Sequence, residues 1–579
     1  MNDISTIRHS LAHIMAYAVK QLYPDVKFAI GPSIDTGFYY DFDLGHSLTT
    51  DDLKVIEAKM NEILKESFDF EHYFLNKTEA MQQFKDQPYK LELIAGIEDK
   101  EVSIYKCGDF IDLCAGPHVA NSRELRSSAF KLTSVAGAYW RGDSTKPMLQ
   151  RIYAAAFADK AQLKQYLYQI EEAKKRDHRK LGPELDLFFL HDTAPGMPYW
   201  MPKGLKLFNT LLDFWREEHE QRGYNEISCP QLNSRELWEI SGHWAHYKDD
   251  MFCFEGNENK PFALKPMNCP NAVMVYKHKV RSYRELPLRL SDCDKLHRYE
   301  ASGTLHGLLR VQSFTQDDSH NFIRQSQISD EINAILDIAD RFYHIFGLTY
   351  KAVLSTRPED FMGDVKLWDK AESELKEIMI KRFGEENFVL NEGDGAFYGP
   401  KIDIKMKDAL NREWQMGTIQ LDFQLPRNFD LTFTNENGEQ EVPVIVHRVI
   451  YGSFERFIGL IIEHFAGAFP FWICPVQVGI VPVSENNFEY AKKVEEILRK
   501  AKISTELKLG DYGMGKKVNE FRVAKVPYVV IVGDKESEEN TVSIKIRGGK
   551  QVNDIKLEKF VEDLKQLKEQ KELNLKEEF

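Results

Sequence analysis

The sequence predicts an α+β protein of several domains. The chain has 579 residues, which is enough for roughly three or four domains of ordinary size. Hydrophobic residues make up 43% of it, so several cores can form. Helical and strand-like segments are interspersed. This pattern is typical of an antiparallel sheet with helices in the centre of the chain and of a smaller α/β domain at its end.

The first segment, residues 1–160, opens with a predicted helix at residues 7–21, which ends before Pro24. A second helix is expected at residues 51–66, and strand-like pieces such as GAYWRGDS and RIYAAAF follow. Residues 161–183 are polar and rich in Lys, Gln and Glu, so we expect a linker helix between two domains there.

The central segment, residues 184–472, mixes helices with short strands. The predicted helices are 205–221, 327–346 and 454–465, and the predicted strands are 288–291, 401–406, 414–423 and 442–447. In the last segment, residues 473–579, strand runs such as VQVGIVPV and VPYVVIVG alternate with helical runs such as KKVNEFRVAK. This alternation predicts a small α/β domain of about 100 residues that ends in a Lys/Glu-rich helix.

Composition and charge exclude several classes of protein. No apolar run reaches the roughly 18 residues of a membrane span, and the N-terminus lacks the pattern of a secretory signal. Seven cysteines are an odd and sparse set, so we expect a cytoplasmic protein with free thiols. The net charge of −14 argues against a nonspecific nucleic-acid coat. The basic run at residues 174–180 is best interpreted as a solvated helix face.

The strongest chemical pattern lies in the central segment and contains two arginines in polar settings. Arg298 opens a polar loop and could clamp a phosphate with two hydrogen bonds. Arg456 follows GSFE at the start of a helix, where the helix-terminal amides add to an anion site. Phe314 could stack on an adenine. Each arginine taken singly is more often part of a surface ion pair, so the prediction depends on the whole pattern.

Together these residues resemble the three signature motifs of the class II aminoacyl-tRNA synthetases. Arg298 and Glu300 stand where motif 2 opens, GSFERF is similar to motif 3, and Pro230 in QRGYNEISCPQL resembles the motif 1 proline at the dimer interface. Within that class the chain is most similar to the threonyl-tRNA synthetases. The supporting phrases are KPMNCP, SGTLHGLLRVQSFTQDDSH, FYGPKID, WQMGTIQLDF and HRVIYGSFERFIG, and the resemblance covers nearly the whole chain.

The resemblance implies an editing domain at residues 1–160, the linker helix at 161–183, a class II catalytic domain at 184–472 and an α/β anticodon-binding domain at 473–579. It implies the ATP- and Mg²⁺-dependent ligation of L-threonine to tRNA(Thr) through threonyl-adenylate, by a cytoplasmic homodimer without membrane contact that also hydrolyses mischarged seryl-tRNA. The implied catalytic residues are Arg298, Glu300, Arg310, Gln316, Lys401 and Arg456, and those that bind threonine or ATP are Met267, Phe314, Asp318, Tyr398, Gln415, Gln420 and Ser453.

The family also implies one zinc ion per subunit, held by Cys269, His320 and His447. A Cys-His-His set with an open fourth position suits a zinc that binds substrate. The three residues are too far apart for their spacing to select them, and each alone would be a buried thiol or a core histidine. A metal that ligates the amine and the hydroxyl of threonine would reject valine, whereas serine lacks only a methyl group, worth about 1–3 kcal/mol. A second, hydrolytic site is therefore expected.

The first segment contains a candidate for that hydrolytic site. Two histidines lie four residues apart on one face of the first predicted helix, and a CxxxH pair flanks the Gly-Pro of DLCAGPHVAN; these residues are His9, His13, Cys114 and His118. Taken alone, the set indicates a metal site or a pair of core histidines. The resemblance implies instead that these residues handle water and the ester of mischarged tRNA, and that Lys90 and Asp112 line the pocket. Whether a metal binds there is left open.

The C-terminal segment contains one candidate contact to the anticodon. Arg547 in TVSIKIRGGK matches a position that the family uses for bases, whereas the loop LGDYGMGKKVNEFRVAK has fewer arginines than the family pattern. The chain starts directly at the editing segment, so we expect the ubiquitin-like domain of many bacterial members to be lacking. Two alternatives are a zinc hydrolase built on the N-terminal histidines and a non-catalytic RNA-binding paralogue that regulates mRNA. The paralogue is disfavoured because it has no need of Arg298, Arg456 or the zinc ligands.

Overall fold

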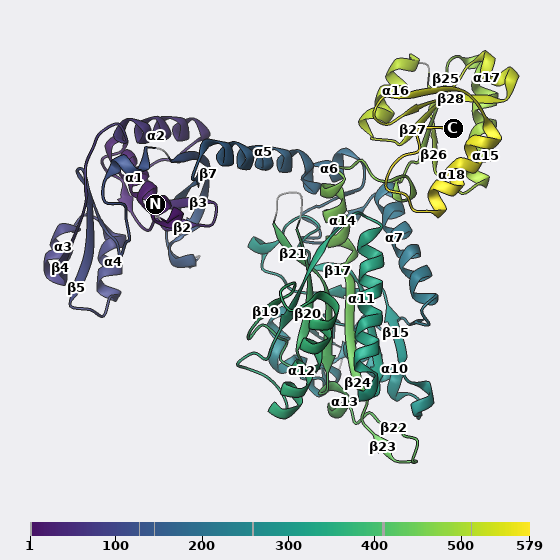
Figure 1. Ribbon diagram of the computed structural model, residues 1–579, viewed down its shortest axis with the longest axis horizontal. Coiled ribbons are helices and arrows are strands. Elements are labelled where there is room, and N and C mark those ends of the chain that lie inside the picture. Colours follow the sequence, from purple (N-terminus) through teal and green to yellow (C-terminus); the bar gives the residue numbers. More distant parts are fainter. Residues whose placement is uncertain (1–2, 127, 144, 257–259, 408–411, 511) are drawn as a thin grey trace. The chain divides into compact units, whose positions relative to one another are not determined.

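The structure is a computed structural model that describes residues 3–126, 128–143, 145–256, 260–407, 412–510 and 512–579. The chain forms two compact units, Met1–Glu171 and Glu172–Phe579. The first unit has two small sheets with helices, and the second has a large central sheet followed by a smaller α/β part (Figure 1). In the described part of the chain, no helix is long and apolar enough to cross a membrane.

In the first unit, α1 (Ile4–Leu22) packs on an antiparallel five-stranded sheet. Its buried face meets strand residues such as Phe38 and Tyr40 in one core. The helix α2 (Thr50–Ile63) begins at a capping box of Thr49 and Asp52. The sheet has the order β1-β3-β8-β7 with β2 on β3, and its strands are β1 (Lys27–Phe28), β2 (Ser33–Ile34), β3 (Gly37–Asp43), β7 (Ala129–Tyr139) and β8 (Met148–Phe157).

A second antiparallel sheet of the first unit brings the CxxxH segment to α1. It has the order β4-β5-β6, and α1 contacts both β5 and β6. Because Cys114 directly follows β6, its side chain comes close to the histidines of α1. The elements are β4 (Phe70–Asn76), α3 (Lys77–Gln83), α4 (Pro88–Gly96), β5 (Glu101–Cys107) and β6 (Phe110–Leu113).

The second unit is organised around a nine-stranded, mainly antiparallel sheet. Its order is β11-β15-β17-β24-β21-β20-β18-β19, with β16 on β17, and only β11–β15 and β18–β19 pair in parallel. The longest strands are β15 (Leu288–Asp292), β17 (Ser313–Ile323), β18 (Tyr350–Ser355), β20 (Lys401–Lys407), β21 (Glu413–Asp422) and β24 (Val444–Ser453). The short strands are β11 (Asn225–Glu226), β16 (Lys295–His297) and β19 (Val389–Asn391).

Helices pack on this sheet and complete a large hydrophobic core. The helix α11 contacts β24 and β21, and α14 contacts β24 and β17. In Figure 1, α11 lies beside β24 and α7 beside α11. The helices are α7 (Pro202–Glu220), α8 (Arg235–Ile240), α9 (His243–Tyr247), α10 (Cys269–Lys277), α11 (Ile328–His344), α12 (Val365–Phe383), α13 (Leu425–Asn428) and α14 (Phe454–His464). Small separate sheets are formed by β9 (Phe188–Phe189) with β10 (Tyr199–Trp200), by β12 (Leu232–Ser234), β13 (Cys253–Glu255) and β14 (Pro261–Leu264), and by β22 (Phe433–Thr434) with β23 (Gln440–Glu441).

The C-terminal part has its own five-stranded sheet and core. The order is β26-β25-β27-β28-β29, in which β25 pairs in parallel with β26 and β27 and the remaining pairs are antiparallel. The strands are β25 (Val478–Pro482), β26 (Thr505–Leu507), β27 (Tyr528–Val532), β28 (Thr541–Ile546) and β29 (Gln551–Lys556). The helices are α15 (Phe488–Lys500), α16 (Met514–Val523), α17 (Asp534–Glu539) and α18 (Leu557–Glu569). This is the small α/β domain that the alternating pattern predicts.

The predicted α+β architecture is confirmed, and several elements differ from the expectation: GAYWRGDS is a strand only as far as Tyr139, and the helix expected at 51–66 ends at Ile63. The strand expected at 442–447 extends to Ser453, because HRVIYGS continues as an almost entirely buried strand. The single helix expected over 161–183 is wrong: α5 (Lys160–Arg176) ends before Asp177, and α6 (His178–Glu184) starts there. Asp177 breaks the helix because its side chain caps α6 by accepting the N–H of Arg179.

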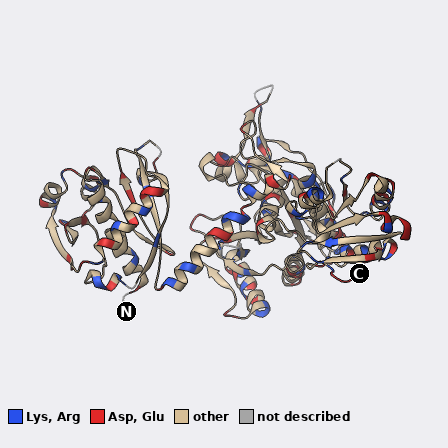
Figure 2. Ribbon diagram, turned by 90° about the horizontal axis from the view of Figure 1, so that it is seen from above, with Lys and Arg blue, Asp and Glu red and all other residues tan. Residues whose placement is uncertain are grey.

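The basic run at residues 174–180 is only partly the solvated helix face that we expect: Lys174, Lys175, Arg179 and Lys180 are exposed, but the run is divided between α5 and α6, and His178 is fully buried. Lys175 and Arg176 both pair with Glu172 one turn earlier, at 2.8 and 3.8 Å. Acidic and basic residues are interspersed along the helices in the same way elsewhere (Figure 2). The exposed part of the run therefore has the mixed charge of an ordinary solvated helix face.

Candidate active sites

A cavity of about 360 Å³ in the second unit is lined by the strands β17, β20, β21 and β24 and by the loops between them. It gathers every residue that the sequence assigns to catalysis or to threonine and ATP binding. These are Arg298, Glu300, Arg310, Gln316, Lys401, Arg456, Met267, Phe314, Asp318, Tyr398, Gln415, Gln420 and Ser453. Two of the predicted metal ligands, Cys269 and His447, line the same cavity.

Three guanidinium groups converge on this cavity. Arg456 lies near the start of α14, where the Ser453 side chain caps the helix, and its Nε donates to the Leu309 carbonyl at 3.0 Å. Arg298 lies with its Cζ 5.1 Å above the Phe314 ring, and Arg310 pairs with Glu300 at 2.7 Å. Burial and the neighbouring Arg298 and Arg310 lower the pKa of Arg456. Such a concentration of positive charge is suited to a polyanion.

Polar side chains on β20 and β21 line another part of the cavity. Lys401 Nζ lies 2.9 Å from Asp403 Oδ2, and Gln415 donates to Asp403 Oδ1 at 2.6 Å. Asp318 on β17 accepts from Asn268 at 3.2 Å, and burial raises the pKa of Asp318 to about 6. These groups offer both hydrogen-bond donors and hydrogen-bond acceptors to a small polar substrate.

Three buried residues at the cavity are close enough to hold one metal ion. Cys269 opens α10, and His320 on β17 lies opposite His447 on β24 in the strand register. Their ligand atoms all lie within 4.8 Å of one another. Both ring nitrogens of His320 and the Nδ1 of His447 are buried without a hydrogen-bond partner. His447 Nε2 lies 2.9 Å from Asp422, which is how a carboxylate orients a metal-ligating imidazole. The donor set therefore fits a zinc ion.

Three supporting residues are not found by sequence reasoning. The Asp317 carboxylate accepts the N–H groups of Ile450, Tyr451 and Gly452 at 2.9–3.0 Å, which fixes the end of β24 just before Arg456. Other such residues are Glu455, which accepts the Thr315 N–H, and the buried His243, whose Nε2 lies 3.1 Å from Met267 Sδ. Burial raises the pKa of Asp317 and of Glu455 to about 7 and lowers that of His243 to about 4. Asp317 and Glu455 lie within the motifs and His243 lies outside them, but none of the three has a sequence signal that assigns it this role.

The first unit contains the second cluster. The Sγ of Cys114 lies 3.3 Å from the Nε2 of His9 and 3.3 Å from the Nε2 of His118. The ring of His13 is 4.2 Å from that of His118, and all four ligand atoms lie within 4.8 Å of one another. Burial raises the pKa of the Cys114 thiol to about 12 and lowers the pKa of all three histidines. The histidines are therefore neutral at pH 7.

A buried ion pair adjoins this cluster. Lys90 Nζ lies 2.6 Å from Asp112, and Asp112 in turn lies 3.7 Å from His13. Tyr40, which sequence reasoning does not identify, donates its hydroxyl to Asp112 at 2.5 Å. The structure thus brings all six residues predicted for this site together. No sequence pattern identifies Tyr40, because its position on β3 is that of an ordinary core tyrosine.

Arg547 lies at the end of β28 and is partly buried. Its guanidinium donates to the backbone carbonyls of Lys525 and Phe469 at 2.9 and 2.8 Å. Arg547 also lines a cavity of about 400 Å³, together with Arg522 and Lys545. The loop with few arginines precedes and includes α16, and its residue Asp511 lies outside the described residues.

Three family descriptions match the chain. They are "tRNA synthetase class II core domain (G, H, P, S and T)" at residues 252–465, "Anticodon binding domain" at 477–567 and "Threonyl and Alanyl tRNA synthetase second additional domain" at 102–153. The first two match the regions of the large sheet and of the C-terminal sheet, and the third matches part of the first unit.

Individual relatives agree with these matches. The threonine–tRNA ligase of Caldanaerobacter subterraneus subsp. tengcongensis is 51% identical over 559 residues, which cover 96% of this chain and 86% of the relative. That of Clostridium botulinum is 50% identical over 563 residues, which cover 97% and 88%. The solved RNA binding domain of threonyl-tRNA synthetase from Cryptosporidium parvum matches with a TM-score of 0.65 and 40% identity, over 68% of this chain and 98% of that chain. The chain therefore belongs to the threonine–tRNA ligases, a family of class II aminoacyl-tRNA synthetases.

Proposed function

We propose that the cavity of the second unit is the site where this aminoacyl-tRNA synthetase activates L-threonine with ATP. The activity is the ATP-dependent ligation of L-threonine to its tRNA through threonyl-adenylate, with hydrolysis of mischarged seryl-tRNA. The observation that carries the site assignment is the presence, around one cavity, of the three arginines and of the Cys269, His320 and His447 set.

The arginines and Phe314 would bind the nucleotide. Each guanidinium group, of Arg298 and of Arg456, can donate two parallel hydrogen bonds to phosphate oxygens. The Phe314 ring offers a stacking surface for adenine. ATP brings Mg²⁺, as the ATP-using class II core implies. The threonine carboxylate then attacks the α-phosphorus, the bond to pyrophosphate breaks, and the arginines stabilise the charge on the phosphoryl oxygens. Gln316, Lys401 and Gln415 would hold the carboxylate and the ribose near the reacting atoms.

Cys269, His320 and His447 would hold one zinc ion per subunit. When bound, zinc would supply ligand positions for the amine and the hydroxyl of threonine. Valine has the amine but no hydroxyl, so it would leave one of the two positions unfilled. The protein's own contribution is to orient the donors, since Asp422 fixes the His447 ring. Pyrophosphate exchange tests the assignment: exchange should depend on threonine, occur weakly with serine and be absent with valine. Equal exchange with valine would contradict it.

The cluster of the first unit is proposed to hydrolyse seryl-tRNA. Neutral imidazoles of His9, His13 and His118 can position or deprotonate a water, and the Lys90 ammonium beside Asp112 can stabilise the developing oxyanion. The four possible ligands of this cluster, His9, His13, Cys114 and His118, could also hold a metal. Deacylation of preformed seryl-tRNA, measured with and without a chelator, separates the two possibilities: we expect hydrolysis to persist with the chelator.

The remaining assignments concern the assembly and its surroundings. The domain limits 1–160, 161–183, 184–472 and 473–579, the cytoplasmic location and the anticodon contact of Arg547 are proposed from the family resemblance.

A homodimer is proposed because the motif 1 residue Pro230 is exposed, and because the nearby Leu232 and Phe254 are 44% and 43% exposed. Light scattering tests this state. A hydrolase without ligase activity would show no pyrophosphate exchange at all.

A further inference from the structure

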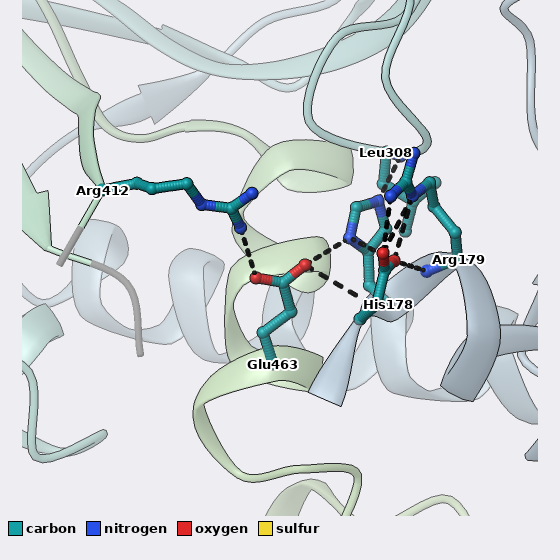
Figure 3. Close-up of polar contacts among 6 residues, drawn as sticks. His178, Arg179, Leu308, Arg412 and Glu463 are labelled. Carbon is teal, nitrogen blue, oxygen red and sulfur yellow. Dashed lines mark hydrogen bonds and ion pairs between the residues drawn. The ribbon is translucent and has the colours of Figure 1, made fainter. Parts of the chain in front are cut away.

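A buried histidine joins separate segments of the second unit outside the nucleotide cavity. His178 is the first residue of α6 and is fully buried. Its Nδ1 lies 2.7 Å from a carboxylate oxygen of Glu463 on α14, and the backbone N–H of Leu308 lies 3.0 Å from its Nε2. Figure 3 shows the imidazole between Glu463 and Leu308. The site already described does not use this residue.

These contacts fix the protonation of the ring. Because the Leu308 N–H can only donate, Nε2 carries the lone pair and the proton resides on Nδ1, where it donates to Glu463. The other oxygen of Glu463 accepts from Arg412 at 3.1 Å. Asp177, His178 and Glu463 are close enough to hold a metal ion, but both ring nitrogens are already in hydrogen bonds. The cluster is therefore a hydrogen-bond relay from Glu463 to the Leu308 amide.

The loop and the helix carry glycines where they approach this histidine. Gly307 has a φ of +53°, and a Cβ at that position would lie 2.1 Å from His178 Nε2. Gly459 on α14 leaves room for Leu309 and Leu308, which would lie 3.1 and 3.3 Å from a Cβ there. The turn at 306–310 is closed by a backbone bridge between His306 and Arg310. The Leu308 amide is thus held at one defined place.

The next two residues of this turn belong to the nucleotide cavity. The carbonyl of Leu309 accepts from Arg456 Nε, and Arg310 pairs with Glu300. Displacing the Leu308 amide would move the acceptor that orients Arg456 and the backbone that carries Arg310. His178 has no contact of this kind with the Cys269, His320 and His447 set in the described residues.

We propose that His178 is a positioning residue for the nucleotide: its neutral imidazole, oriented by Glu463, holds the Leu308 amide and with it the turn that places Arg310 and Arg456. This inference rests on the proposed function of the cavity. Loss of the acceptor at Nε2 should weaken ATP binding and leave threonine binding unchanged.

Two amide variants of His178 distinguish the role of its Nε2 from that of its Nδ1. His178→Gln can place an acceptor near the Nε2 position, whereas His178→Asn reaches only the Nδ1 position. In pyrophosphate exchange, His178→Asn should raise the KM for ATP about tenfold, the effect expected when a buried N–H loses its acceptor. His178→Gln should restore most of the ATP affinity, and both variants should keep the threonine KM and the zinc content. His464→Gln, on the same helix α14 but outside the relay, is the matched control and should behave as wild type.

Amide exchange of the peptide 305–310 supplies a readout that needs no activity. Exchange should be faster in His178→Asn than in His178→Gln or the control. If His178→Asn fails to fold, Gly307→Ala displaces the same turn by meeting the imidazole, and it should also raise the ATP KM selectively. Equal changes in both KM values in the Gln and Asn variants, with a common loss of melting temperature, would mean that His178 only packs, and would overturn the proposal. If wild type shows no exchange of pyrophosphate, the function of the cavity is wrong, and the amide exchange alone decides the role of His178.

Discussion

The two clusters of cysteine and histidine use the same residue types but differ in their neighbours. The set of Cys269, His320 and His447 lies on a helix start and two buried strands, and the ring nitrogens of His320 have no hydrogen-bond partner. In the set around His9 and Cys114 the thiol lies 3.3 Å from each of two imidazoles, and only the Nδ1 of His13 among the described atoms of this set is buried without a hydrogen-bond partner. Both sets have a spacing that could hold a metal, but the first leaves three ring nitrogens without a partner, which supports the proposed zinc ion, whereas the second lies beside the Lys90–Asp112 ion pair, which supports the proposed ester hydrolysis.

The largest expected effect comes from disrupting the set of Cys269, His320 and His447, which is proposed to hold zinc. Cys269→Ala should lose bound zinc and reduce threonine activation by on the order of 10³-fold, because a Lewis-acid contact is worth several kcal/mol. Zinc content and pyrophosphate exchange measure this, and hydrolysis of preformed seryl-tRNA by the first unit serves as the internal control. Normal threonine activation by protein shown to be free of zinc would contradict the distinction between the clusters.

The next effect concerns the arginines of the same cavity. Arg456→Lys keeps the charge but loses the planar fork, so pyrophosphate exchange should fall by about 10²–10³-fold. Seryl-tRNA hydrolysis should not change. Lys525→Arg, which keeps a cation in the C-terminal part, is the control substitution. Near-normal pyrophosphate exchange by the Arg456→Lys variant would contradict the proposal that Arg456 binds phosphate.

The double substitution His9→Ala and His13→Ala tests the other cluster. Hydrolysis of preformed seryl-tRNA should fall by about 10²-fold or more, the usual contribution of acid–base groups, while threonine charging stays intact. Rates of deacylation for wild type and variant give the answer directly. Equal rates would return the histidines of α1 to a packing role.

A smaller effect is expected from Asp422, the carboxylate proposed to orient His447. Asp422→Asn keeps the Oδ1 acceptor for the Gln424 N–H but presents an amide donor to His447, which favours the wrong tautomer. Zinc affinity should therefore fall by about 10–100-fold. Competition with a chelator of known affinity measures it, and unchanged affinity would show that Asp422 does not orient the ring.

The pH dependence should be the smallest effect. Burial lowers the pKa of His9 and of His13 below the ordinary value of 6.5. A lowered pKa means that the imidazoles stay neutral where an ordinary histidine would be half protonated. Seryl-tRNA hydrolysis should then be nearly constant from about pH 7.5 to about pH 6. A rate that falls in proportion to hydroxide over this range would indicate that the histidines are not the groups that set it.

Local patterns in the sequence predicted much of the fold and part of both sites. The spacing of His9 and His13 and the position of Arg456 after GSFE are local, so the sequence alone placed them on helices. The meeting of His320 with His447 depends on the register of β17 and β24, which no local pattern contains, and it came only from the family resemblance.

The sequence did not identify the buried residues that accept hydrogen bonds from distant backbone N–H groups. Asp317 and His178 look like ordinary polar residues, because their function depends on backbone N–H groups far away in the sequence. The break at Asp177 was also missed, since the composition of residues 161–183 favours helix throughout and the capping geometry of one aspartate decides the outcome.

The crowding of guanidinium groups in the nucleotide cavity has a consequence for how the enzyme responds to its medium. Arg298 and the exposed Arg310 repel the partly buried Arg456, so a bound polyanion acts as their counter-ion. Any triphosphate or diphosphate will relieve the repulsion, including the pyrophosphate that the reaction releases. Pyrophosphate should therefore compete with ATP, and salt should weaken both, because dissolved ions screen the same charges.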